Sequence, residues 1–307
     1  MNTNVDIKRV SCFKDKKKDK AYLSKWVEKL EKLNDRRYER LSVTTSLGET
    51  VIYGLNTEKK ELPALVIFPG FRTTSLIWDF DKGLDHLGCE ARIFMVETNG
   101  QPNLSEGNSP DIKGYGYGYW ANEVLEGLNL NKVIVAGASF GGIVALKLCI
   151  VHSEKVQTAV LLNPGCFTFA SLTPKVMWPS MMSLLIPNRK YVKKFIEEVV
   201  FYPPHHMLSD QAYELLQEYE QFAIKRYKDR TQKPRSMKDQ LKEVSVPVYL
   251  LQGDKDPLFP WRKNARIAKE MLGNNLIENK LMENVSHGIE CYFPAMEYLG
   301  EIVRKFN

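Results

Sequence analysis

A short apolar run that enters a helix through a glycine-rich turn is the feature that most limits what this chain can fold into. Residues 133–136 read VIVA, residues 137–142 read GASFGG, and residues 143–151 have the apolar composition of a buried helix. A strand that is apolar on both faces is typical of a parallel sheet covered by helices. The segment therefore predicts a strand–turn–helix unit at the centre of an α/β fold.

Similar units recur along the chain. Strand-like apolar runs occupy residues 49–55, 62–68, 91–96, 156–162, 246–251 and 276–282. Helical patterns follow Ser75 and occupy residues 20–34, 120–128 and 292–306. This alternation predicts a mostly parallel sheet with helices on both faces. The alternation lapses at residues 167–242, which contain helix-like runs and no strong strand, so an inserted helical lid is expected there.

The predicted organisation therefore has three parts. Residues 1–44 form a basic arm with an amphipathic helix, residues 45–166 and 243–307 form an α/β core, and residues 167–242 form the lid or cap. The lysine run at residues 14–20 supplies much of the net charge of +6. A solvated, mobile arm is favoured over contact with anionic lipid or nucleic acid, because no aromatic-studded basic surface follows the run.

Composition narrows the partners. The five cysteines are scattered, which fits neither a disulfide framework nor paired metal spacing, and no cofactor or metal is expected. No apolar run is long enough for a signal peptide or a membrane helix. A cytoplasmic protein without a nucleic-acid partner is expected, and its oligomeric state stays open.

The turn at residues 137–141 matches the pattern G-x-S-x-G, with Ser139 at its centre. On a sharp strand-to-helix turn a serine hydroxyl is exposed as a nucleophile, and glycines at 137 and 141 avoid collisions within the turn. Two other glycine-rich sites do not fit: no P-loop lysine follows, and the glycine spacing differs from that of a dinucleotide site.

A serine nucleophile needs a base. Of the five histidines, only His287 follows the last predicted strand, at the sheet edge where the turn opens. His86 and His152 lie in or after helices away from this edge, and His205 and His206 lie in the lid. Two acids, Asp254 and Asp256, follow the strand at 246–251, and either could orient the histidine.

The order Ser, Asp, His resembles the α/β-hydrolase superfamily, over residues of about 45 to 305. The family pattern G-x-x-D-x-x-x-P is similar to Gly253-Asp254-Lys255-Asp256 with Pro260, and the resemblance favours Asp256 as the acid. It also implies an oxyanion hole made by the backbone N–H groups of Phe71 and Phe140. The family often has His-Gly before the first donor, where this chain has Pro69-Gly70.

The resemblance implies a serine hydrolase that cleaves a small carboxylic ester through an acyl-enzyme, of the carboxylesterase or lipase kind. A C–C bond hydrolase, a thioesterase, an acyltransferase and a non-catalytic binding protein on the same fold stay open. Lid residues are expected to line an apolar pocket, with a core of the lid itself as the alternative. They are Met177, Trp178, Met181, Met182, Phe195, Phe201 and Tyr202. Side chains expected to border its mouth are Asn103, Ser105, Asn108 and Tyr115.

Overall fold

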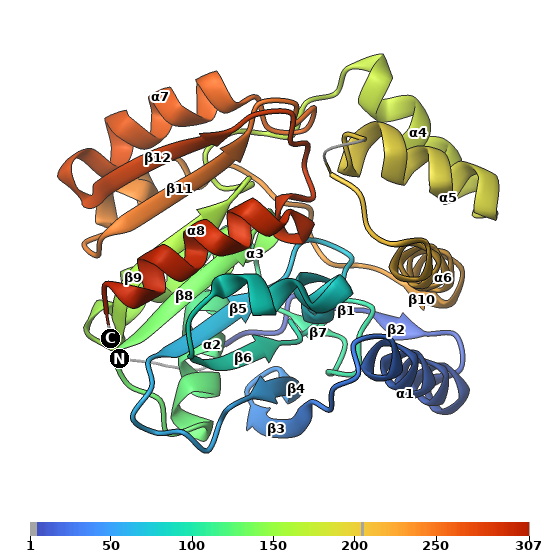
Figure 1. Cartoon of the computed structure of the whole chain (residues 1–307), viewed down its shortest axis with the longest axis horizontal. Helices are drawn as coiled ribbons and strands as arrows, with labels where there is room; N and C mark the ends of the chain where they lie inside the picture. The colour runs from blue at the N-terminus through green and yellow to red at the C-terminus, as the bar shows by residue number, and fades with distance from the viewer. Residues whose placement is uncertain (1–4, 204–205, 307) are drawn as a thin grey trace.

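A twisted sheet flanked by helices forms the centre of the molecule (Figure 1). The structure is a computed structural model that describes residues 5–203 and 206–306. Within these residues the sheet has eight strands in the order β12-β11-β9-β8-β5-β6-β4-β3. Their bounds are β3 (Glu39–Thr45), β4 (Gly48–Leu55), β5 (Ala64–Phe68), β6 (Arg92–Val96), β8 (Val133–Ala138), β9 (Val156–Leu162), β11 (Val248–Gly253) and β12 (Leu276–Met282). The pairs β3/β4 and β4/β6 are antiparallel and the other pairs are parallel.

Strand β5 shows how the sheet separates two apolar cores. Leu65 and Ile67 lie in the core shared with the 3₁₀ segment η1 (Ser75–Leu87) and with α8 (Phe293–Arg304). Val66 and Phe68 lie in the core shared with α2 (Gly116–Gly127), α3 (Phe140–Val151) and α7 (Trp261–Leu272). Because successive side chains of a strand point to opposite faces, one continuous apolar run serves both cores.

The insertion between β9 and β11 is helical. It contains α4 (Pro174–Leu185), α5 (Arg189–Phe195), a π-helical turn η3 (Ile196–Val200) and α6 (Asp210–Arg226), followed by the 3₁₀ turn η4 (Lys238–Glu243). Figure 1 shows α4, α5 and α6 grouped on one side of the sheet. None of the described helices is both long and apolar enough to cross a membrane.

The N-terminal helix α1 (Lys16–Leu33) packs beside α6 (Figure 1). The indole N–H of Trp26 donates to the carbonyl of Leu215 at 2.9 Å, and the ring of Tyr22 stacks on Phe222 with 4.2 Å between centroids. Short strands add to this contact: β2 (Cys12–Phe13) pairs with β10 (Tyr227–Lys228), and β1 (Arg9–Val10) pairs with β7 (Asn108–Ser109). The N-terminal arm is therefore fixed to the lid and to the core.

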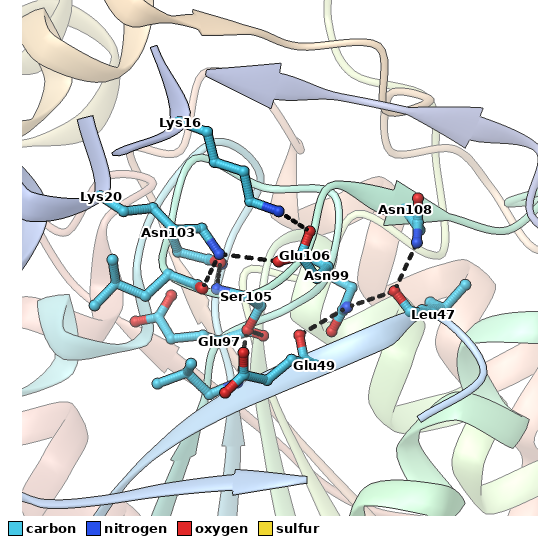
Figure 2. A network of polar contacts seen from close by, with 12 residues as sticks. Lys16, Lys20, Leu47, Glu49, Glu97, Asn99, Asn103, Ser105, Glu106 and Asn108 are labelled. Carbon is cyan, nitrogen blue, oxygen red and sulfur yellow. Dashed lines mark hydrogen bonds and ion pairs between the residues drawn. The ribbon is translucent and has the colours of Figure 1, made fainter. Parts of the chain in front are cut away.

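The prediction of a mobile lysine arm was wrong, because every lysine of the run except Lys14 lies in the first turns of α1. Asp15 caps this helix by accepting the N–H of Lys18 at 3.1 Å. Lys16 and Lys20 reach Glu106 of the core at 2.9 and 3.2 Å (Figure 2). These two contacts lie at the surface or partly buried and lower the pKa of Glu106 against the opposing effect of burial.

The long loop after β6 also differs from the prediction, because its polar side chains face inward. Asn103 donates to the carbonyl of Thr98 at 2.9 Å. Ser105 donates to the carbonyl of Glu97 at 2.8 Å, and Asn108 to that of Leu47 at 3.0 Å (Figure 2). Tyr115 bonds Glu243 at 2.7 Å. Asn103 and Ser105 satisfy carbonyls of the irregular loop itself, and none of these four side chains lines the cavity beside Ser139.

Strand β3 was not predicted, since its sequence ERLSVTT is mostly polar, as suits the edge of a sheet. The sheet consequently begins at Glu39, ahead of the core boundary expected at residue 45. Helix α7 was also missed. The other boundaries between arm, core and lid stay predictions.

Candidate active site

Ser139 occupies the turn between β8 and α3, in a backbone conformation that L-residues rarely adopt. Its φ is 50° and its ψ is −109°. The turn is held from both sides: the N–H of Ser139 donates to the carbonyl of Leu162 at 3.0 Å, and its carbonyl accepts the N–H of Gly165 at 2.9 Å. Such strain persists only where the surroundings enforce it, and it projects the hydroxyl away from the sheet.

The two glycines that flank the turn have no room for a side chain. A Cβ at Gly137 would lie 2.7 Å from the backbone nitrogen of Gly142. A Cβ at Gly141 would overlap the carbonyl of Phe68, with 2.6 Å to the carbonyl carbon. The start of α3 thus packs directly against the end of β5 at Gly141 and against the end of β8 at Gly137, and these two close approaches require glycine.

His287 and Asp256 lie on two loops at the carboxyl edge of the sheet and contact each other. Nδ1 of His287 is 3.0 Å from Oδ2 of Asp256. The other carboxylate oxygen accepts the N–H groups of Leu258 and Phe259 at 2.8 and 3.2 Å, which fixes the carboxylate. Asp254 instead lies 3.2 Å from the ammonium of Lys255. Of the two acids, the fold brings Asp256 to the histidine, and this is the acid that the family pattern favours.

His287 is partly buried, and its protonation reflects opposing effects. Burial lowers the pKa of His287, but the charge of Asp256, the hydrogen bond to it and the charge of Glu290 outweigh burial and raise the pKa above its usual value. Ser139 and His287 line the same cavity of about 330 Å³. Between these two described side chains the structure shows no direct hydrogen bond, a common state of unliganded catalytic pairs.

Two backbone N–H groups adjoin the serine. That of Phe140 is the first of α3, where N–H groups have no acceptor within the helix. That of Phe71 follows Gly70, and a Cβ on Gly70 would lie 3.7 Å from Cβ of Ser139, so this loop touches the serine. Within the described chain neither N–H has an acceptor, whereas the next N–H, of Arg72, is held by Gln101 at 2.7 Å.

Asn163 joins the loops of the site, a role that the sequence reasoning missed. Its carbonyl oxygen accepts the N–H of Gly253 at 2.8 Å, and its amide donates to the carbonyls of Ser286 and His287 at 2.8 and 3.1 Å. Its φ of 40° is one that asparagine tolerates. The sequence signal that could have indicated this role is an asparagine directly after a buried strand.

More than half of the chain, residues 121–291, matches the family model described as serine aminopeptidase, S33. The chain belongs to this family.

Carboxylesterase YbfK of Bacillus subtilis is similar to this chain, with 23% identity over 87% of this chain and 87% of the relative. The crystal structure of that esterase, CesB, superposes with a TM-score of 0.76 at 20% identity over 94% of this chain and 98% of the other. The naproxen esterase of B. subtilis gives 0.73 at 21% identity, over 94% and 98%. The predicted α/β-hydrolase fold is confirmed.

The residues that line the cavity beside Ser139 mostly differ from the predicted pocket residues. Of the seven predicted lid residues, Phe195 lines the cavity and the other six do not. Met177, Trp178 and Met181 are 49%, 53% and 43% exposed, and Met182 is only partly buried. The prediction was wrong for α4 because the other face of this helix points inward. The lid residues that line the cavity are Ala170, Ser180, Ser183, Leu184, Phe195, Ile196, Val200, Leu216, Glu220, Ile224, Lys233 and Pro234.

Two carboxyl groups also line this largely apolar cavity, and neither was predicted. Burial raises the pKa of Glu220 to about 7, although the charge of Arg72 lowers it. Burial likewise raises the pKa of Glu290, against the effect of His287. Both groups are therefore disposed to hold a proton more tightly than an exposed glutamate does.

The remaining histidines serve other contacts or lie outside the description. His86 stacks on Phe293, His152 pairs with Glu154, and His206 packs against Phe201. His205 lies outside the described residues. Within residues 5–203 and 206–306, no cluster of three potential metal ligands occurs.

Proposed function

We propose that this chain is a serine hydrolase of carboxylic esters, with Ser139, His287 and Asp256 as the catalytic triad. The observation that carries the proposal is their placement: three loops far apart in sequence meet at one cavity, where the serine is strained and the histidine is oriented by a buried carboxylate. The relatives named as carboxylesterases favour an ester over other carbonyl substrates.

The geometry fits a two-step mechanism. His287 accepts the proton of the Ser139 hydroxyl as its oxygen attacks the ester carbonyl, and the N–H groups of Phe71 and Phe140 stabilise the oxyanion. The alcohol leaves with the proton from the imidazolium, so that an acyl-enzyme forms. Water, deprotonated by the same histidine, then releases the acid and restores the serine. Asp256 holds the imidazole in one tautomer and stabilises its charged form.

A fluorophosphonate probe tests the nucleophile. We expect labelling of the wild type and of Ser180→Ala, a second serine at the cavity, whereas Ser139→Ala is not labelled. Persistent labelling of Ser139→Ala would remove Ser139 from its role. Hydrolysis of p-nitrophenyl esters is then compared with that of aminoacyl p-nitroanilides. A higher kcat/KM for the anilides would contradict the ester assignment. The cytoplasmic location expected from the sequence stays a prediction.

A further inference from the structure

Helix α4 turns its apolar side chains toward solvent. Its exposed residues, with their exposed fractions, are Met177 (49%), Trp178 (53%), Met181 (43%), Leu184 (44%) and Leu185 (69%). Spacings of three, four and seven place them along one side of the helix. We call this set the α4 face. Contiguous apolar surface of this kind is uncommon on a protein that has no partner for it.

The opposite side of α4 is the one that packs against the rest of the protein. Val176, Pro179 and Ser183 are buried there. The hydroxyls of Ser180 and Ser183 line the cavity and donate to carbonyls of the same helix, at 2.7 and 2.8 Å. The α4 face is thus not required for a core inside the lid, and its exposure needs another explanation.

The α4 face is continuous with the edge of the cavity. Leu184 is 44% exposed and also lines the cavity. On the segment before α4, Ala170 lines the cavity, while Phe169 and Leu172 near it are 59% and 75% exposed. Apolar surface therefore runs from solvent to the space beside Ser139.

The chain segment that carries the α4 face and the next helix has charged side chains of one sign only. Residues 174–195, which span α4 and α5, contain five basic residues and no acidic residue. Arg189 and two of the lysines pair with glutamates beyond this span. Lys175 and Lys190 are exposed, and among the described residues no carboxylate forms an ion pair with them. Two exposed lysines, on α4 and α5, are thus left to meet an anionic partner.

We propose that the α4 face, together with Phe169 and Leu172, docks the protein on an anionic lipid surface, with acyl esters entering the cavity from that surface. Apolar side chains, including a tryptophan, would enter the headgroup region while nearby lysines meet the anionic headgroups. A second copy of the chain fits less well, because a twofold contact would bring two identical basic surfaces together. The entry of substrate rests on the proposed function, whereas the docking does not.

Flotation with vesicles tests the docking. The full chain is mixed with vesicles of phosphatidylcholine and phosphatidylglycerol, or of phosphatidylcholine alone. We expect flotation with the anionic vesicles, and a loss with Trp178→Ser/Met181→Ser of at least about tenfold in partition coefficient. Replacing Lys175 or Lys190 by glutamine should weaken partitioning about fivefold each.

A matched control is Ile277→Ser. This side chain is 51% exposed on β12, away from the lid, and its replacement should leave partitioning unchanged. Equal flotation with neutral vesicles, or an equal loss for Ile277→Ser and the double variant, would overturn the proposal. So would a dimer in light scattering that the double variant abolishes, since the α4 face would then cover a second copy.

Hydrolysis of a soluble ester separates this proposal from the proposed function. Trp178 and Met181 do not line the cavity, so the double variant should hydrolyse p-nitrophenyl butyrate like the wild type and lose rate only on esters embedded in anionic vesicles. Soluble hydrolysis without flotation would reject the docking and keep the esterase. If flotation needs the α4 face but no ester is hydrolysed, the docking is kept and the esterase assignment is rejected.

Discussion

Replacing Asp256 by asparagine would remove a buried carboxylate 3.0 Å from Nδ1 of His287. When the histidine accepts the serine proton, the new imidazolium interacts with this charge. At that separation the Coulomb energy is about 5 kcal/mol for an effective dielectric constant of about 20. Because about 1.4 kcal/mol corresponds to a factor of ten in rate, we expect kcat to fall between about 10³-fold and 10⁴-fold.

The same substitution should shift the pH profile. In the wild type the imidazole must be unprotonated to act as a base, so kcat/KM falls as the pH drops below the raised pKa of His287. The asparagine variant loses the charge and the hydrogen bond of Asp256, while burial still lowers the pKa. The acidic limb of kcat/KM should therefore move to lower pH, although the maximal rate is smaller.

Asp254→Asn is the matched control. This residue lies on the same loop, but its carboxylate contacts Lys255 and the N–H of Val285 rather than His287. Initial rates on p-nitrophenyl butyrate, measured from acidic to alkaline pH, should stay within about twofold of the wild type for this variant. Equal losses for the two variants, or a loss below about tenfold for Asp256→Asn, would refute the assignment of Asp256.

Three other substitutions test the surroundings of the site. Gly141→Ala should lower the free energy of unfolding, measured in urea, by about 3 kcal/mol and the esterase rate by at least about 100-fold, because the added Cβ overlaps the Phe68 carbonyl. Its control is Gly114→Ala, where the nearest atom to the added Cβ is 3.8 Å away, so neither the free energy of unfolding nor the rate should change. Glu220→Gln should abolish a rise in KM for apolar esters above pH 7, since the wild-type group ionises with a pKa of about 7 inside the cavity. Burial lowers the pKa of Lys147 to about 8, whereas the unfolded chain holds this proton to higher pH, so the contribution of Lys147 to the free energy of unfolding rises as the pH is raised above about 8. Lys147→Met should remove this rise.

Each of these three has a result that contradicts it. Equal unfolding midpoints for the two alanine variants would show that β5 and α3 can separate without cost. A KM that still rises above pH 7 in Glu220→Gln would assign the titration to another group. A stability difference between wild type and Lys147→Met that is constant from pH 7 to about pH 10 would show that this lysine keeps its proton when folded.

Much of the fold followed from local patterns. The buried strands of the sheet are continuous apolar runs, and their positions were predicted to within a few residues. Strand β3 was missed because it is polar, as suits the edge of the sheet, and its place depends on a neighbour that a local pattern does not contain. Helix α7 was missed although its pattern is strong, since Asn264, Ala268 and Leu272 recur every four residues on its buried side.

The candidate site divides in the same way. The turn around Ser139 is specified locally, because glycine spacing and the adjoining strand and helix are all within about twenty residues. The residues around Asp254 and Asp256 did not by themselves decide between the two acids, although the resemblance to the family pattern favoured Asp256. Both lie on one loop, and only the packing of β11 beside β12 turns one carboxylate toward His287 and the other toward Lys255.

The sequence by itself determined a parallel sheet with a strained serine at its carboxyl edge, since periodicity and glycine spacing act through neighbouring residues. Tertiary structure alone decided which face of α4 meets the cavity. Composition shows that the helix is apolar, but the rotation of a helix about its axis depends on what packs against it, and here the serines face inward while Trp178 faces solvent.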